Sequence, residues 1–431
     1  MKYRAYTKAF LITGHNNPPI IESSTILVND KGRIDEVGAA NSITIPPNYE
    51  IIDLSGHYLM PGLINGHVHF VTKGTMGKTP SGFVKEILKN VLSTPLGKML
   101  LKKQYKDCLH TALNAGITSV RDLGSLFELD TYYRTRISKG KQKGPRILAS
   151  GAPVIPTGGH GSEYPGAGIA DGPWEGRKRV RERIAQGVDW IKICNTGGVT
   201  DAKYIGEAGM PQMTVEEIEA ICSEAHMRGI MVASHCESTK GIADALAGGV
   251  DTIEHGADFG PELAAQFLNN PKALRGYTSL IPTIAASDAV CRQLEAQDQQ
   301  NEIDKIVLAN AKLINAGSQL ALKKALEYGV KVGIGDDASV PGVTHYNLYK
   351  ELINFTKGGL SPLEAIQTAT YHTAQILNID KITGSIEPGK EADFIVLQNN
   401  PLDNLESLYK PKHVVARGYY MKTPRFKNLG L

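Results

Sequence analysis

The chain has 431 residues, and its 47 lysines and arginines are nearly balanced by 44 aspartates and glutamates. This balance gives no indication of a nucleic-acid or membrane-surface partner, and no apolar run is long enough to cross a bilayer. The five scattered cysteines lack C-x-x-C spacing, as is typical of free thiols, so we expect a cytoplasmic protein.

The two ends of the chain both read as short strands separated by turns. Near the start, apolar runs flank the turn at 30–32, and near the end similar runs occupy 392–397 and 414–418. Neither end has enough strands to bury a core by itself. We therefore predict that residues 1–58 and 384–431 pair into one small β-sandwich domain.

The region between them, residues 59–383, alternates strand-like and helical patterns. After the strand that leads into His67, strands are predicted at 117–121, 146–150, 190–194, 230–236, 252–255, 277–283 and 331–336. Eight strand–helix units predict an α/β protein with a (β/α)8 TIM barrel, whose chemistry lies at the carboxyl ends of the strands. The long segment 71–103, rich in glycine and proline, is predicted to be a lid or substrate wall at that face.

The first strand ends in the motif L-M-P-G-L-I-N-G-H-V-H-F, residues 59–70. In an extended strand His67 and His69 point to the same side, while Val68 points to the other. Two imidazoles converging at a strand end suit a divalent cation such as zinc. Because H-x-H is common by chance, this hypothesis depends on residues further along the chain.

The strand at 190–194 carries a lysine between two isoleucines. If Ile191 and Ile193 face the outer helices, Lys192 points into the barrel. Holding a buried lysine neutral at pH 7 costs about 4–5 kcal/mol, so Lys192 needs either a carboxylate partner or another source of compensation.

Three later strands end in residues whose side chains can bind a metal ion. His235 ends one strand, His255 ends the next, and the last strand, K-V-G-I-G-D-D-A-S, ends in two aspartates. With Val332 and Ile334 facing the helices, Asp337 shares the inward side and Asp336 points away. Asp337 is therefore the candidate ligand.

At this point the motifs resemble the amidohydrolase superfamily along the whole chain. P-G-L-I-N-G-H-V-H is similar to its first-strand signature, and the single histidines and the late aspartate occur in its order. I-K-I followed by T-G-G-V, the upstream T-G-G-H-G, T-I-E-H-G and S-P-L-E-A-I-Q-T-A-T resemble the prolidase-like and arginine-carboxypeptidase-like subgroup, which is related to imidazolonepropionase.

The resemblance implies a binuclear zinc centre with a carboxylated Lys192 bridging two Zn²⁺ ions. His67, His69 and Asp337 would hold one ion, and His235 and His255 would hold the other. Such a centre lowers the pKa of water from 15.7 to about 7, and Asp337 would act as the catalytic base. The implied reaction cuts an amide beside a free carboxylate in a small molecule, such as an Xaa-Pro or Xaa-Arg/Lys dipeptide or an N-acyl amino acid. Relatives commonly assemble, which implies a homo-oligomer.

The sequence departs from the family pattern in two places that concern the substrate. The usual G-T-D-A reads G-D-D-A, which adds Asp336, and Glu237 follows His235 where relatives often carry small or aromatic residues. His160, in the glycine-flanked loop T-G-G-H-G, is a third candidate for substrate binding. Each of these side chains could instead be an ordinary surface or hydrogen-bonded residue.

Two other functions stay open on the sequence. The first is hydrolysis of a cyclic amide, as in imidazolonepropionase, although such relatives usually lack the bridging lysine. The second is a catalytically inactive scaffold of the same fold, against which the complete set of six ligands argues. Metal content distinguishes the scaffold from both hydrolases.

Overall fold

The computed structural model describes residues 1–75 and 90–425. The chain divides into two compact units. The terminal unit contains residues 1–65, 109–120 and 346–425, and the central unit contains the described residues of 66–108 and 121–345. The terminal unit thus includes segments from within the range 59–383, besides the two chain ends.

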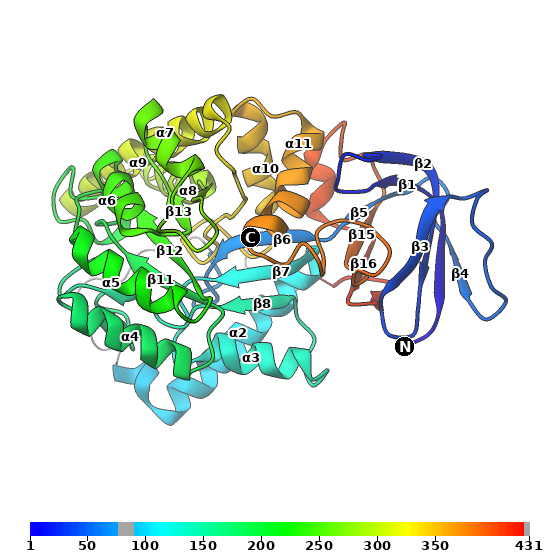
Figure 1. The fold of residues 1–431 in the computed structure, drawn as a ribbon, viewed down its shortest axis with the longest axis horizontal. Helices are drawn as coiled ribbons and strands as arrows, with labels where there is room; N and C mark the ends of the chain where they lie inside the picture. Colours follow the sequence, from blue (N-terminus) through cyan, green and yellow to red (C-terminus); the bar gives the residue numbers. More distant parts are fainter. Residues whose placement is uncertain (76–89, 426–431) are drawn as a thin grey trace. The chain divides into compact units, whose positions relative to one another are not determined.

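Strands from both chain ends pair in one sheet of the terminal unit (Figure 1). Its order is β17-β16-β15-β5-β1-β2-β3, and β4 also pairs with β1. The two ends meet where β15 runs antiparallel to β5, with Phe394 opposite Pro61. The bounds are β1 Arg4–Ile12, β2 Ile20–Val28, β3 Ile34–Ala39, β4 Glu50–Asp53, β5 Tyr58–Pro61, β15 Phe394–Leu397, β16 His413–Ala416 and β17 Tyr419–Met421. The expected pairing of the ends is present in this sheet, while the β-sandwich remains a prediction.

Helices of the terminal unit follow residue 346. They are α10 Leu348–Lys357, α11 Pro362–Gln367, the π-helix η2 Thr368–His372, α12 Thr373–Ile376 and the 3₁₀ helix η3 Leu405–Tyr409. Ser361 begins α11 with a capping box, because its hydroxyl accepts the N–H of Glu364 and its own N–H donates to the Glu364 carboxylate. The motif S-P-L-E is thus a helix start.

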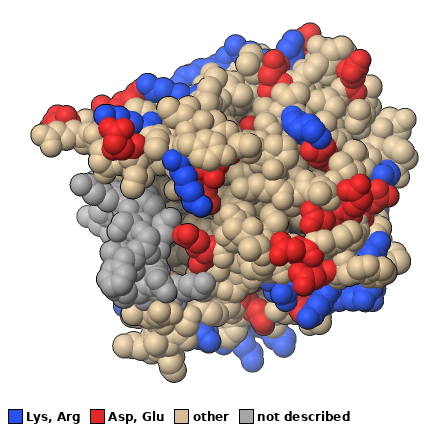
Figure 2. All heavy atoms as spheres, turned by 90° about the vertical axis from the view of Figure 1, so that its left-hand side faces the viewer, with Lys and Arg blue, Asp and Glu red and all other residues tan. Residues whose placement is uncertain are grey.

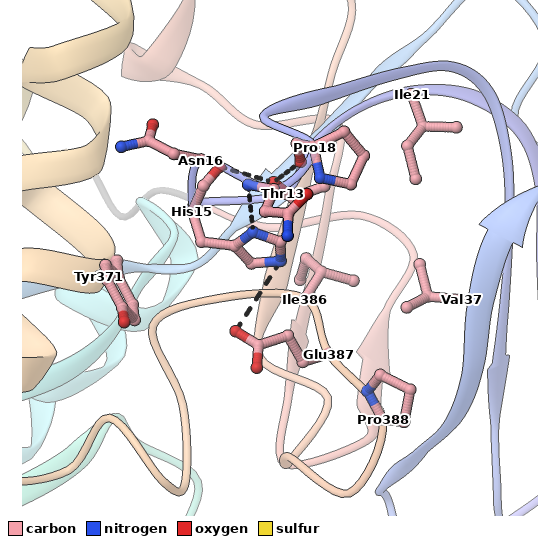
Figure 3. Close-up of a pocket in the computed structure, with 11 residues that line it drawn as sticks. Thr13, His15, Asn16, Pro18, Ile21, Val37, Tyr371, Ile386, Glu387 and Pro388 are labelled. Carbon is pink, nitrogen blue, oxygen red and sulfur yellow. Dashed lines mark hydrogen bonds and ion pairs between the residues drawn. The ribbon is translucent and has the colours of Figure 1, made fainter.

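The terminal unit contains a cavity of about 670 Å³, shown in Figure 3. Thr13 and residues 15–18 line it together with Tyr371 and Glu387, and His15 Nε2 lies 3.9 Å from Glu387 Oε1. None of the residues that the sequence nominates for a metal or substrate lines this cavity. The candidate metal ligands lie in the central unit instead.

The strands that carry these ligands form two sheets. One has the order β6-β7-β8, and the other has the order β10-β9-β11-β12-β13-β14. Their bounds are β6 Leu63–Val68, β7 Ile117–Asp122, β8 Arg146–Ala149, β9 Val154–Ile155, β10 Gly168–Ile169, β11 Trp190–Cys194, β12 Met231–Cys236, β13 Thr252–His255 and β14 Ser279–Ile281. Because β11 to β14 pair in parallel, their carboxyl ends lie at one edge.

The last predicted strand, 331–336, is not continuous in the structure; Val332 and Ala338 form only isolated bridges. The backbone of this segment nevertheless forms hydrogen bonds with β14 on one side and with β6 on the other. The N–H groups of Leu280 and Gly66 donate to the carbonyls of Lys331 and Ile334, and Asp337 N–H donates to His67 O. The α/β architecture is therefore confirmed, but the described strands form separate sheets and barrel closure stays a prediction.

Helices connect these strands, and α4, α5 and α6 lie outside β11 and β12 in Figure 1. The bounds are α2 Pro95–Asn114, α3 Leu129–Ser138, α4 Pro173–Ala185, η1 Val199–Asp201, α5 Val215–His226, α6 Thr239–Gly248, α7 Pro261–Leu268, α8 Ile284–Glu295 and α9 Glu302–Tyr328. Asn301 and Asp304 form a capping box that begins α9. Of the predicted lid, residues 76–89 lie outside the described residues, and residues 95–103 form the start of α2.

The outer face of these helices is visible in Figure 2, which views the molecule from the left-hand side of Figure 1. Acidic and basic side chains are interspersed over it. Within residues 1–75 and 90–425, the structure contains no helix that is both long enough and apolar enough to cross a membrane.

Close packing of α5 on α6 leads to a first prediction. A Cβ at Gly248 would lie 2.3 Å from Ile218 Cγ2 and 2.7 Å from Ile218 Cβ. Gly248→Ala should therefore destabilise the protein by about 1–3 kcal/mol through overpacking, measured by urea denaturation.

Gly260→Ala is the matched control, because no atom lies within 4 Å of its added Cβ. The double variant Gly248→Ala/Ile218→Ala removes the clashing methyl group and should show coupling between the two sites. Equal stability of Gly248→Ala and the unmutated protein would contradict this packing.

Candidate metal centre

Two groups of metal-ligand side chains lie in the central unit. The first group is His67, His69 and Asp337, and the second is His235, Glu237 and His255. Within each group the ligand atoms lie within 4.8 Å of one another. The rings of His67 and His255 are 5.1 Å apart between centroids, so the two groups are neighbours.

The first group forms where β6 meets the segment around Asp337. Asp337 Oδ1 lies 3.1 Å from His69 Nε2 and 3.5 Å from His67 Nε2. Burial favours the neutral carboxyl, but the two imidazoles hold the pKa of Asp337 well below its ordinary value. The structure therefore brings together the three residues that the sequence nominates for the first ion.

Asp336 is in neither of the two ligand groups. It is fully buried, and its Oδ1 accepts the N–H of Ala338 at 3.0 Å. This bond fixes the turn that carries Asp337. A role for Asp336 in substrate binding remains a prediction.

The second group sits at the ends of β12 and β13. The ring centroids of His235 and His255 are 4.4 Å apart. His255 Nδ1 lies 2.6 Å from the hydroxyl of Thr283, and His235 Nε2 lies 3.3 Å from the carbonyl of Gly197. Burial lowers the pKa of His235 and lowers that of His255 well below its ordinary value. Both imidazoles are thus neutral at pH 7, the form that binds metal.

Lys192 occupies the middle of β11, opposite Ala233 of β12, and is only 4% exposed. Among residues 1–75 and 90–425, no carboxylate lies within 4.0 Å of its Nζ, so the alternative of a simple lysine–carboxylate pair is not present there. Its charge helps to lower the pKa values of His67, His235 and His255, although burial contributes most. Lys192 therefore acts electrostatically on histidines of both groups.

His67 is oriented by residues that the sequence analysis did not identify. Its Nδ1 donates to Glu254 Oε2 at 2.8 Å, which leaves Nε2 toward Asp337. Glu254 is fully buried and also accepts from Arg121 Nη2 at 2.7 Å. Burial would raise the pKa of Glu254, but Arg121 and His67 hold it at about 2. This carboxylate–histidine contact is the arrangement that orients metal-binding histidines in many proteins.

Arg121 is held just as firmly in the buried interior. Its Nε donates to the carbonyl of Gly66 at 2.6 Å, its Nη1 donates to Thr252 Oγ1 at 3.0 Å, and its guanidinium stacks on Trp190. The available sequence signal was a charged residue inside each of two buried strands, in V-R-D and T-I-E-H-G. Opposite charges in two such strands indicate a partnership.

His160 is also fixed, beside the second group. Its Nδ1 lies 2.8 Å from Asp201 Oδ1, its backbone N–H donates to Gln212, and its ring stacks on His235 at 4.5 Å. Burial opposes a positive charge, but Asp201 raises the pKa of His160 above its ordinary value. His160 is thus a positioned side chain with Nε2 as its remaining polar atom.

Three residues near the histidines have left-handed backbone conformations. The φ angles are +70° at His255, +44° at Thr283 and +55° at Asp337. Such angles are uncommon outside glycine and are most unusual for a β-branched threonine. Strain of this kind persists where packing and hydrogen bonds enforce it, and it clusters at functional sites.

The cysteines beside the site are not activated. Burial raises the pKa of Cys194 and of Cys236 to about 12. A raised pKa disfavours the reactive thiolate, so neither Cys194 nor Cys236 is favoured as a nucleophile.

The Glu254 contact leads to a second prediction. Glu254→Gln should weaken zinc binding by about 10–100-fold, because Gln cannot polarise His67 as a carboxylate does. Zinc affinity is measured by competition with a chromophoric chelator, and folding is checked by circular dichroism.

Glu224→Gln is the control, since Glu224 is a buried carboxylate on α5 that pairs with Arg181 at 2.9 Å. It should change stability without changing zinc affinity. Equal zinc affinity of Glu254→Gln and the unmutated protein would contradict the orienting role.

The chain is similar to several known proteins over most of its length. An ochratoxinase from Aspergillus niger is 28% identical over 445 residues, covering 96% of this chain and 85% of that protein. A prolidase-like protein from Bifidobacterium longum is 36% identical with a TM-score of 0.84, covering 99% of this chain and 96% of that one. A Xaa-Pro dipeptidase structure with methionine bound in its active site is 30% identical with a TM-score of 0.82, covering 97% and 99%. The model of the amidohydrolase family matches residues 58–420, and the chain therefore belongs to that family.

Proposed function

We propose that this protein is a zinc-dependent hydrolase that cuts an amide bond next to a free carboxylate, with a dipeptide or an N-acyl amino acid as substrate. The observation that carries the proposal is the adjacency of two ligand groups, His67–His69–Asp337 and His235–Glu237–His255, beside the buried Lys192. Amide hydrolysis fits the ochratoxinase and dipeptidase relatives. We further propose that the two sheets of the central unit belong to one TIM-type barrel, which the bonds of residues 331–338 to β14 and β6 support.

The donor set fits two zinc ions. Neutral imidazole nitrogens and carboxylate oxygens are zinc ligands, and three of the four histidines are kept neutral by burial. When bound, the metal pair makes hydroxide available near neutral pH and polarises the scissile carbonyl. This is the chemistry that amide hydrolysis requires.

Lys192 completes the proposed centre as a carbamate. A buried lysine without a carboxylate partner costs several kcal/mol, since its reference pKa near 10.4 favours the charged form. Reaction of the neutral amine with carbon dioxide forms an N–C bond and releases one proton. The product is an anion with two oxygens, which two cations would neutralise, so the modification removes the burial problem.

Asp337 is the proposed proton carrier. Its carboxylate is ionised and lies among the histidines of the first group, so it can accept a proton from water. It can then return this proton to the leaving nitrogen. The left-handed backbone at Asp337 and the neighbouring Asp336–Ala338 bond hold the carboxylate in place.

The proposed substrate carboxylate binds at the loop that carries His160. The loop offers the imidazole, oriented by Asp201, in a cavity that Gly158, Gly159 and Gly198 also line. A free amino acid in the active site of the Xaa-Pro dipeptidase relative supports a site for such a group. Charge-assisted hydrogen bonds to a carboxylate contribute about 1.5–3 kcal/mol each.

A third prediction tests Lys192. The unmutated protein should carry close to two zinc ions per chain, and Lys192→Ala should lose at least one of them together with most activity, because the bridge is absent. Metal content is measured by plasma mass spectrometry, and the carbamate by extra mass in native mass spectrometry.

Short-chain carboxylic acids should partly restore both properties to Lys192→Ala by replacing the missing anion. Arg183→Lys is the control, because it changes a basic residue elsewhere in the central unit, where Arg183 donates a hydrogen bond to the carbonyl of Ala152. A fully active Lys192→Ala protein with two zinc ions would end the bridging hypothesis.

A fourth prediction tests the substrate. Amidating the carboxylate of a hydrolysed dipeptide should lower kcat/KM at least tenfold per hydrogen bond lost, since 1.4 kcal/mol is one decade. His160→Ala should show a similar loss on the free acid but little further loss on the amide.

This lack of additivity would show that His160 and the carboxylate act on each other. Equal turnover of acid and amide by the unmutated enzyme would contradict the carboxylate site. It would favour cyclic or non-peptide amides instead.

A further inference from the structure

Glu237 is held rigidly between β12 and α6. It lies two residues after His235 and directly before Ser238, whose hydroxyl caps α6 by accepting the N–H of Gly241 at 3.1 Å. The backbone N–H of Glu237 donates to Thr196 Oγ1 at 3.1 Å. The whole residue is only 8% exposed, so its carboxylate is fixed in the interior of the site.

One oxygen of the Glu237 carboxylate is buried and unsatisfied among the described residues. This atom, Oε2, forms no hydrogen bond with any group in residues 1–75 and 90–425. This oxygen lies 3.7 Å from His235 Nε2, which is beyond hydrogen-bond distance. A buried carboxylate without a hydrogen bond or a cation is costly, and proteins normally compensate such a group with a paired charge or a metal.

The surroundings of this oxygen match a metal site. The ligand atoms of His235, Glu237 and His255 lie within 4.8 Å of one another, and all three residues are buried. His255 Nδ1 is bonded to Thr283, which leaves its Nε2 as the metal-binding nitrogen. Two histidines and one glutamate form a donor set that zinc accepts in catalytic sites.

We propose that Glu237 is a third protein ligand of the second zinc ion, in addition to His235 and His255. The inference rests on the proposed function and deepens it, because it gives the second ion three ligands of its own. That ion is then bound independently of the Lys192 bridge, whereas the first ion is held by His67, His69 and Asp337. Glu237 was nominated from sequence as a substrate contact, and the inference assigns it to metal binding.

The geometry favours a divalent ion over a substrate ammonium group at this position. A zinc ion accepts lone pairs from two imidazoles and one carboxylate at once, and its charge of +2 offsets Glu237. The three side chains are also well buried, since His235, Glu237 and His255 are 5%, 8% and 6% exposed. Recognition of a cationic substrate is the outcome that the experiment must distinguish.

The test is zinc titration of the purified full-length chain, with Glu237→Gln, Glu237→Asp and the matched control Asp201→Asn. Asp201 is a neighbouring carboxylate that pairs with His160, outside both ligand groups. Zinc per chain is measured after dialysis, and both affinities are measured by chelator competition. Cobalt(II) substitution adds a visible spectrum that reports the ligand number.

We expect one zinc affinity of Glu237→Gln to fall at least tenfold while the other is unchanged, with an altered cobalt spectrum. Glu237→Asp should also weaken that site, because its shorter side chain withdraws the oxygen while keeping the charge. Asp201→Asn should leave both affinities unchanged. Lys192→Ala should retain one zinc ion, and Lys192→Ala/Glu237→Gln should lose it.

If a folded Glu237→Gln protein bound both zinc ions as tightly as the unmutated protein does, the inference would be overturned but the proposed function would stand. If that variant also lost turnover of substrates with a free amino group selectively, Glu237 would be a substrate contact instead. Failure of the unmutated chain to bind zinc would overturn the proposed function itself. Near-ultraviolet circular dichroism verifies folding, and Glu237→Asp provides the second variant if Glu237→Gln does not fold.

Discussion

The fully buried contact between Arg121 and Glu254 is the interaction on which the first ligand group depends. Both side chains are 0% exposed, and they lie on strands of two different sheets. Arg121 also bonds the backbone of β6 at Gly66, one residue before His67, while Glu254 bonds the His67 ring itself. One ion pair thus fixes both the backbone and the imidazole of a proposed ligand.

A buried pair of this kind contributes more to specific geometry than to stability. Removing charges from water is costly, and the attraction between them repays the cost only with further hydrogen bonds. Here Thr252 and His67 supply those bonds, so each charged group has several partners. Loss of either charge would leave the other one buried and uncompensated, which typically costs about 3–5 kcal/mol.

The second group is organised differently from the first. His255 is anchored by a neutral hydroxyl, that of Thr283, and both residues have strained backbones. Glu237 approaches from a helix cap, and His160 stacks on His235 from a separate loop. Asp337 of the first group has a left-handed backbone as well, so the difference between the groups is the buried Arg121–Glu254 ion pair, which orients His67 of the first group.

The sequence by itself determined the parts of this protein that follow from local periodicity. The alternation of strands and helices and the pairing of the chain ends follow from local patterns, and the shared side of His67 and His69 follows from side-chain direction along a strand. The grouping of these histidines with Asp337 came from the family resemblance, and the structure places the three residues together. Only the tertiary structure decided which distant charges meet. Glu254 lies 187 positions after His67 in the chain, and Asp201 lies 41 positions after His160, yet the side chains of each pair are in contact. Sequence also could not show that Glu237 is buried beside His235 and His255 without a hydrogen bond at Oε2, because burial and pairing are properties of the folded interior.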